Sequence, residues 1–131
     1  MTIGFRILPS PPPPAKRLLE AFATLPTSNI SDNMLRHYGA GARLRPFHRG
    51  AKLVGPAFTV KTRPGDNLPT HKTIDMAAPG DVILVDAGGA LDLAIIGEVM
   101  YSNGWRHDMA GKGLVGAIGG GDTIVAAGFL V

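Results

Sequence analysis

The stretch from Arg63 to Met100 constrains the fold most, because turn, helix, strand and glycine-loop signals follow one another in it without interruption. After a first Pro-Gly pair, either Asp66 or Asn67 can cap a helix. A second Pro-Gly pair, at 79–80, predicts the end of that helix. The apolar run from Val82 to Val85 follows, and a run of this length between turn signals predicts a strand buried on both faces.

A glycine pair, Gly88 and Gly89, comes after this strand. Leu91, Ile95 and Val99 then recur at helical spacing and predict a second helix. A strand, a glycine loop and a helix N-terminus together gather unpaired N–H groups, which suit a carboxylate or a phosphate. Alternatively, the glycines only make a tight connection in a parallel sheet. The spacings of the common nucleotide-binding loops are absent.

Further elements are expected outside this stretch. Residues 15–25 carry an apolar helical face, and a short helix is expected at 32–38, capped from the Thr-Ser segment before it. Residues 52–62 are rich in β-formers and should pair with the strand at 81–85. A short buried strand is expected at 113–118.

Composition narrows the class of protein. A chain of 131 residues, 45% of them hydrophobic, is long enough for one core but short for two. The net charge of +3 comes from scattered basic residues, so no direct binding of nucleic acid is expected. The chain has no cysteine, and no stretch approaches the roughly 20 apolar residues of a membrane span. We therefore expect a soluble, cytoplasmic protein that binds no membrane.

Three segments carry a resemblance to a known family: KLVGPAFTV at 52–60, PGDNLPTHKTIDMAAPGDVILVDAGG at 64–89, and GEVM at 97–100. In this order they resemble the family that includes the regulator of ribonuclease activity A (RraA) and the class II 4-hydroxy-4-methyl-2-oxoglutarate aldolases. The resemblance covers residues 27–118 and weakens after Ile118. It implies an α/β fold of the RraA-like, swivelling β/β/α type, a layered mixed sheet with flanking helices. It also implies a homo-oligomer, a trimer or hexamer with sites between subunits.

The resemblance also divides the chain. Residues 1–14 end in PSPPPP, which favours an extended polyproline II arm that is poorly ordered or lies across a neighbouring subunit. Residues 15–131 would form the RraA-like domain, shortened at its C-terminus relative to other members of the family.

The resemblance implies a metal site. In the aldolases a strand similar to GLVGAI leads into a D-G-x-x-R-D motif, whose Arg binds the keto acid and whose last Asp ligates a divalent metal. Here residues 119–122 are GGGD, so Asp122 corresponds to the metal ligand and no Arg precedes it. Glu98 corresponds to an acid that contacts metal-bound water, and the metal would be Mg²⁺ or Mn²⁺. Alternatively, Asp122 only ends a loop and Glu98 only favours the first turn of a helix.

The same resemblance implies a substrate site. Backbone N–H groups near Gly97, Val99 and Met100 would hold the substrate carboxylate, and Asn67 would lie near the cleft. Arg106 could replace the missing Arg, although nothing in its spacing requires this.

The function that the resemblance implies is that of a metal-dependent lyase with Glu98 and Asp122 as catalytic residues. It would release pyruvate from a small 2-oxo acid, either by retro-aldol cleavage of a 4-hydroxy-4-methyl-2-oxo dicarboxylate or by decarboxylation of oxaloacetate. The alternative is a non-enzymatic RraA-like regulator that binds a ribonuclease or another protein partner. The missing Arg favours this alternative.

Overall fold

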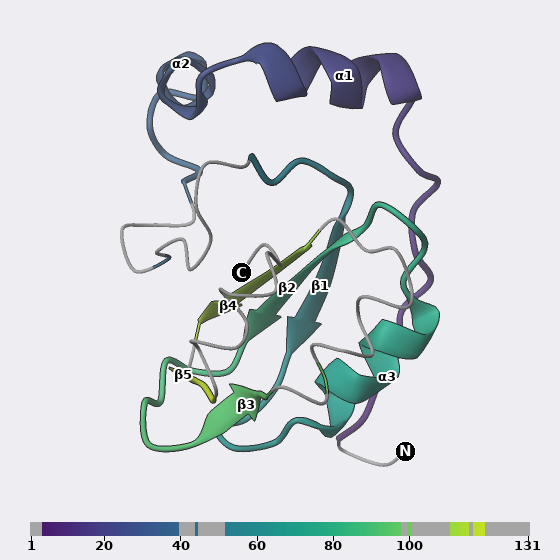
Figure 1. Cartoon of the computed structure of the whole chain (residues 1–131), viewed down its shortest axis with the longest axis vertical. Helices are drawn as coiled ribbons and strands as arrows, with labels where there is room; N and C mark the ends of the chain where they lie inside the picture. Colours follow the sequence, from purple (N-terminus) through teal and green to yellow (C-terminus); the bar gives the residue numbers. More distant parts are fainter. Residues whose placement is uncertain are drawn as a thin grey trace.

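The structure is a computed structural model of the chain, and it describes residues 4–39, 44, 52–97, 100, 111–115 and 117–119. Two small sheets, three helices and an extended N-terminal segment make up this part of the chain (Figure 1).

The larger sheet has three strands in the order β1-β2-β4. They are β1 (Ala57–Lys61), β2 (Val82–Asp86) and β4 (Gly111–Val115), and both pairs are parallel. The predicted pairing of the segment at 52–62 with the strand at 81–85 is therefore confirmed. β2 lies in the centre, which explains its continuous apolar sequence, because a central parallel strand meets apolar neighbours on both faces.

A second sheet of two strands contains β3 (Ala94–Ile96) and β5 (Ala117–Ile118), again in parallel. The α/β class with helices beside a sheet is confirmed, whereas the expected mixed sheet is not found: every strand pair in the described ranges is parallel. The strand predicted at 113–118 is divided between β4 and β5, which belong to different sheets.

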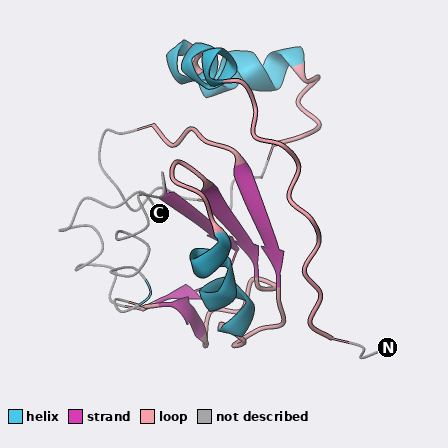
Figure 2. Cartoon of the chain, turned by 90° about the vertical axis from the view of Figure 1, so that its right-hand side faces the viewer, coloured by secondary structure: helices cyan, strands magenta, loops and turns pink. Residues whose placement is uncertain are grey.

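The helix α3 (Leu68–Met76) lies across one face of the larger sheet (Figure 2). Pro69 stands in its first turn, where a missing N–H costs nothing, and the helix ends before the second Pro-Gly pair as predicted. Its buried Ile74 joins side chains of both sheets in the core. The buried apolar residues of this core are Val60, Ile74, Ala77, Ile83, Val85, Ala87, Ile95, Ile96 and Met100.

Two helices precede the sheet. α1 (Lys16–Thr24) confirms the helix predicted at 15–25, whereas α2 (Thr27–Asn33) corrects the one predicted at 32–38. Pro26 occupies the N-cap position of α2, so the helix begins at the first Thr of the segment that was expected only to cap it. It ends early because Leu35 and Arg36 adopt left-handed φ angles of 53° and 60°.

The helix predicted from Leu91, Ile95 and Val99 is wrong where the structure describes it. Residues 94–96 form the strand β3 instead, and Leu91 is 82% exposed while Ile95 is 1% exposed. The two side chains therefore do not share a buried helical face. The strand forms because β5, a segment distant in sequence, supplies its hydrogen-bonding partner.

Candidate functional site

The ends of β1 and β2 meet at one edge of the parallel sheet, where open α/β sheets usually bind ligands. The N–H of Thr62, directly after β1, donates to the carbonyl oxygen of Asp86 at the end of β2 (2.9 Å). The turn after β1 and the glycine loop after β2 also touch, since a Cβ on Gly88 would lie 3.3 Å from Pro64 Cγ. The loops that the sequence predicted to carry function are thus adjacent.

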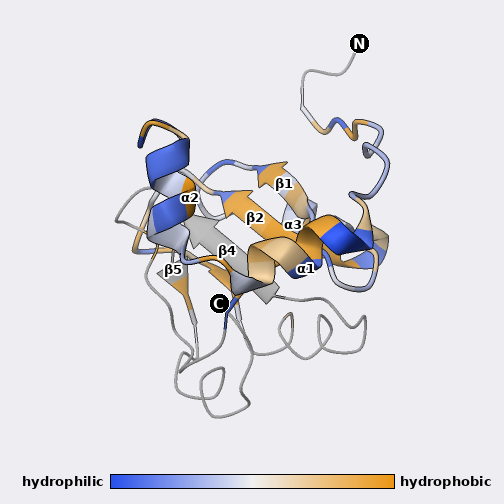
Figure 3. Cartoon of the chain, turned by 90° about the horizontal axis from the view of Figure 1, so that it is seen from above, coloured by the Kyte–Doolittle hydropathy of each residue, from blue (hydrophilic) through white to orange (hydrophobic). Residues whose placement is uncertain are grey.

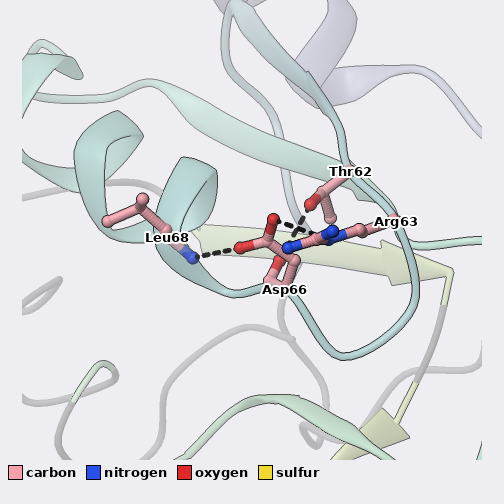
Figure 4. Close-up of polar contacts among 4 residues, drawn as sticks. All are labelled: Thr62, Arg63, Asp66 and Leu68. Carbon is pink, nitrogen blue, oxygen red and sulfur yellow. Dashed lines mark hydrogen bonds and ion pairs between the residues drawn. The ribbon is translucent and has the colours of Figure 1, made fainter. Parts of the chain in front are cut away.

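Asp66 organises the turn that leads into α3 (Figure 4). Its Oδ1 accepts the N–H of Leu68 (3.2 Å), and its Oδ2 accepts Arg63 Nε (3.2 Å). Its carbonyl oxygen accepts the hydroxyl of Thr62 (2.8 Å). Of the two candidate caps, Asp66 is therefore the residue that bonds the first turn of the helix.

Asn67 occupies the N-cap position of α3, but its side chain makes no capping hydrogen bond. The residue is exposed beside this turn. The turn itself packs against the start of β3, because a Cβ on Gly65 would lie 2.8 Å from Leu93 Cδ1. The predicted substrate-binding role of Asn67 thus stays a prediction.

The anion site predicted at Gly88 and Gly89 does not form as expected. Both glycines have left-handed φ angles of 73°, which confirms the tight turn, but a strand follows them in place of a helix N-terminus. The N–H of Gly88 is already bonded to Asp86 Oδ1 (3.0 Å). The alternative interpretation, that the glycines make a tight connection in a parallel sheet, agrees with the structure.

The ends of β3 and β5 also lie close together. The N–H of Gly119 donates to the carbonyl oxygen of Ile96 (2.8 Å), and Ile96 is in register with Ile118. Gly97, the next residue after β3, is partly buried here. The segment that runs into GEVM and the segment that runs into GGGD therefore leave the smaller sheet from neighbouring positions.

The structure describes only some of the predicted site residues. Gly97 lies where these two strands end, and Met100 is helical and 4% exposed in the core. Glu98, Val99 and Asp122 lie outside the described residues, as does Arg106. Their predicted roles stay predictions.

The described residues do not by themselves fit a metal ion. No group of three or more His, Cys, Asp or Glu side chains that could hold one is found among them. The two acids at the sheet edge are engaged by the chain itself: Asp66 by Arg63 and Leu68, and Asp86 by Gly88. The predicted metal ligand Asp122 and the predicted acid Glu98 lie outside the described residues, so the metal site stays a prediction.

Sequence reasoning missed the parts played by Thr62 and Asp86, which join the loops after β1 and β2. A signal for Asp86 was present, since an Asp two residues before a Gly often accepts the N–H of that residue in a turn. The position of Arg63 at this edge was also not singled out.

The described part of the chain is an α/β domain. A glycine loop lies at the carboxyl edge of its parallel sheet, a helix covers one face of that sheet, and the candidate site is formed by loops. The sequence profile of the family described as "RraA-like: Aldolase/RraA" matches residues 27–130, and the chain belongs to this family. The resemblance inferred from the sequence is thus confirmed, and the match extends beyond Ile118.

Among curated proteins, the chain is similar to a "Putative 4-hydroxy-4-methyl-2-oxoglutarate aldolase" from Halalkalibacterium halodurans. The two are 37% identical over 97 residues, which cover 74% of this chain and 46% of that protein. The chain therefore spans about half the length of this curated relative.

Solved structures show the same fold. An uncharacterized protein from Pseudomonas syringae has a TM-score of 0.78 at 24% identity, over 96% of this chain and 59% of its own. The RNA-processing inhibitor RraA from Thermus thermophilis has a TM-score of 0.70 at 23% identity, over 81% and 64%.

No helix within the described ranges is long and apolar enough to cross a membrane.

Proposed function

We propose that the chain contributes the site of a metal-dependent lyase that releases pyruvate from a small 2-oxo acid, of the 4-hydroxy-4-methyl-2-oxoglutarate aldolase or oxaloacetate decarboxylase type. The observation that carries the proposal is the pairing of β3 with β5, with the hydrogen bond from Gly119 to Ile96. Because of this pairing, the segment that leads to Glu98 and the segment that leads to Asp122 leave the smaller sheet from neighbouring positions, although the two residues are far apart in sequence. The name of the Halalkalibacterium halodurans relative supports the same chemistry.

The chain's own residues would divide the work as follows. By the resemblance, backbone N–H groups near Gly97, Val99 and Met100 would hold the substrate carboxylate, because N–H groups at the start of a helix favour an anion. Asn67, exposed beside the capped turn of α3, would supply a neutral donor near the same cleft. Asp122 would ligate Mg²⁺ or Mn²⁺, and Glu98 would position water. Such a metal, when bound, supplies positive charge for the oxygen of the pyruvate enolate as the carbon–carbon bond breaks.

A consequence of the GGGD sequence is slow turnover. The family's motif has an Arg directly before the metal-binding Asp, and Gly121 stands at that position here. A guanidinium binds a carboxylate through two charge-assisted hydrogen bonds, which glycine does not replace. Loss of one preorganised contact of this kind typically costs on the order of a hundredfold in rate.

A pyruvate-release assay tests the proposal, with oxaloacetate and a 4-hydroxy-4-methyl-2-oxo dicarboxylate as substrates. We expect Mg²⁺ or Mn²⁺ to stimulate turnover, a chelator to remove the stimulation, and Asp122→Ala to reduce it by about a hundredfold or more. Asp75→Ala, which removes an exposed acid on α3, is the matched control and should keep full activity. Full activity of the Asp122 variant would place the metal elsewhere.

The same missing Arg favours a second function, that of a regulator that binds a ribonuclease or another protein without turning over a small molecule. Under this alternative no pyruvate forms above the uncatalysed rate with either metal. Instead, the protein should inhibit a ribonuclease in an RNA-cleavage assay, with saturation at a fixed stoichiometry.

A further inference from the structure

An open apolar groove lies between α1 and the start of the larger sheet, at the end opposite to the candidate site. Its volume is about 700 Å³. The α1 groove, as we call it, is lined mainly by apolar side chains of α1 and its C-cap, of the segment before β1 and of β2: Leu18, Phe22, Leu25, Leu53, Val54 and Leu84. Leu18, Phe22 and Leu25 are 40–48% exposed, and α1 has no buried residue. An amphipathic helix with its apolar face this open lacks part of its packing.

The position of α1 above the sheet is fixed by a specific contact. Lys52 Nζ donates to the carbonyl oxygens of Ala23 (3.0 Å) and Leu25 (3.5 Å) at the end of the helix. A cation at a helix C-terminus is favourable for the unpaired carbonyls and the helix dipole there. Lys52 therefore links the end of α1 to the segment before β1 on the other side of the groove.

The N-terminal arm, residues 4–14, presents a second uncovered apolar set. Phe5, Ile7 and Leu8 are 55%, 50% and 64% exposed. The arm contains no helix or strand, and it leaves the start of α1 and runs toward the opposite end of the molecule (Figure 1). Seen from above, with hydropathy in colour, it stands away from the body of the domain (Figure 3).

The arm cannot easily turn back into the groove of its own chain. The PSPPPP segment separates Leu8 from α1, and proline fixes φ, which favours a stiff extended conformation. At about 3.1 Å per residue, the segment at residues 9–14 spans about 19 Å and so keeps Leu8 at least that far from α1. The chain thus has an apolar groove and an apolar segment that a rigid spacer keeps apart.

We infer that the arm of one copy occupies the α1 groove of a second copy. Exchange between neighbouring copies covers every arm and every groove, and it is compatible with the trimer or hexamer that the resemblance implies. The apolar character of both surfaces fits this occupant, and the proline segment projects the arm outward as a bridge between copies. The inference does not depend on the proposed catalytic function.

Cysteine cross-linking tests the contact directly, because the chain has no native cysteine. Ile7→Cys protein is mixed with a size-tagged Phe22→Cys protein and oxidised mildly. We expect a disulfide-linked pair of the two different chains on a non-reducing gel. The matched control replaces Phe22→Cys by Lys72→Cys, an exposed position on α3, and should give little of the mixed product. Equal yields from both mixtures would overturn the inference, and so would the absence of a cross-link to the groove.

Sedimentation velocity on the full chain gives the second test. Phe5→Ser with Leu8→Ser should raise the dissociation constant of the assembly by at least about tenfold, whereas Arg6→Ser, which removes no apolar side chain, should leave it unchanged. All three changes fall in an exposed arm, so the fold should persist. A wild-type chain that stays monomeric at high micromolar concentration, or an assembly whose dissociation constant does not change with the arm substitutions, would refute arm exchange.

Discussion

Single polar residues decide how the loops at the sheet edge are built. Asp66 bonds both Arg63 and the first turn of α3, and Asp86 bonds the glycine loop after β2. The two side-chain interactions of Asp66 should contribute unequally to the free energy of unfolding. Arg63 is 82% exposed at its side chain, and ion pairs in solvent contribute little, whereas an unpaired N–H at a helix start is costly.

The first prediction separates the two roles of Asp66. Asp66→Ala should lower the free energy of unfolding by about 1 kcal/mol, the usual cost of losing a helix-capping acceptor. Asp66→Asn keeps an acceptor for Leu68 N–H and loses only the ion pair, so the loss should stay within about 0.5 kcal/mol. Arg63→Ala should lower the free energy of unfolding by as little as Asp66→Asn does, because it too removes only the ion pair. Urea denaturation measures all three variants.

Asn67→Ala provides the control, because this residue holds the N-cap position without a capping bond. Its stability should match the wild type within about 0.5 kcal/mol. If Asn67→Ala proved as costly as Asp66→Ala, the assignment of the cap to Asp66 would fail.

The element that differs most from expectation is β3. Ile95 is 1% exposed within it, whereas Leu91, which belongs to the same helical pattern in the sequence, is 82% exposed. The strand is short, and it pairs with β5, which lies more than twenty residues further along the chain. It also positions Gly97, so the candidate site depends on it.

The second prediction therefore compares these two residues. Ile95→Ala should cost about 2 to 5 kcal/mol, because it removes a fully buried side chain from the core and leaves a cavity. Leu91→Ala should change the unfolding free energy by less than about 0.5 kcal/mol. Comparable losses in urea denaturation would indicate a shared buried face and restore the helix.

At the scale of the whole molecule, the described chain is a core of two parallel sheets and α3, to which α1, α2 and the arm are added at the edges (Figure 2). The chain covers 46% of the length of its curated relative. The resemblance implies a homo-oligomer, and arm exchange would add contacts between its copies.

The third prediction concerns metal binding and stability. A ligand that binds only the folded state stabilises it by about 2.7 kcal/mol at a hundred times its dissociation constant. If Asp122 ligates the metal, Mn²⁺ should raise the melting temperature of the wild type in thermal denaturation and not that of Asp122→Ala. Asp75→Ala should respond like the wild type. An unresponsive wild type would argue against a metal site, whatever the activity.

The sequence by itself determined the elements whose signals are local. Prolines and capping residues bound α1 and α3, and the uninterrupted apolar run specified β2 as a buried strand. Tertiary structure decided β3, since helical spacing around Ile95 was outweighed by hydrogen bonding to β5 and burial in the core. It also brought Gly97 beside Gly119. Such pairings join residues that no local pattern relates, because strand partners are set by which apolar faces can be buried together.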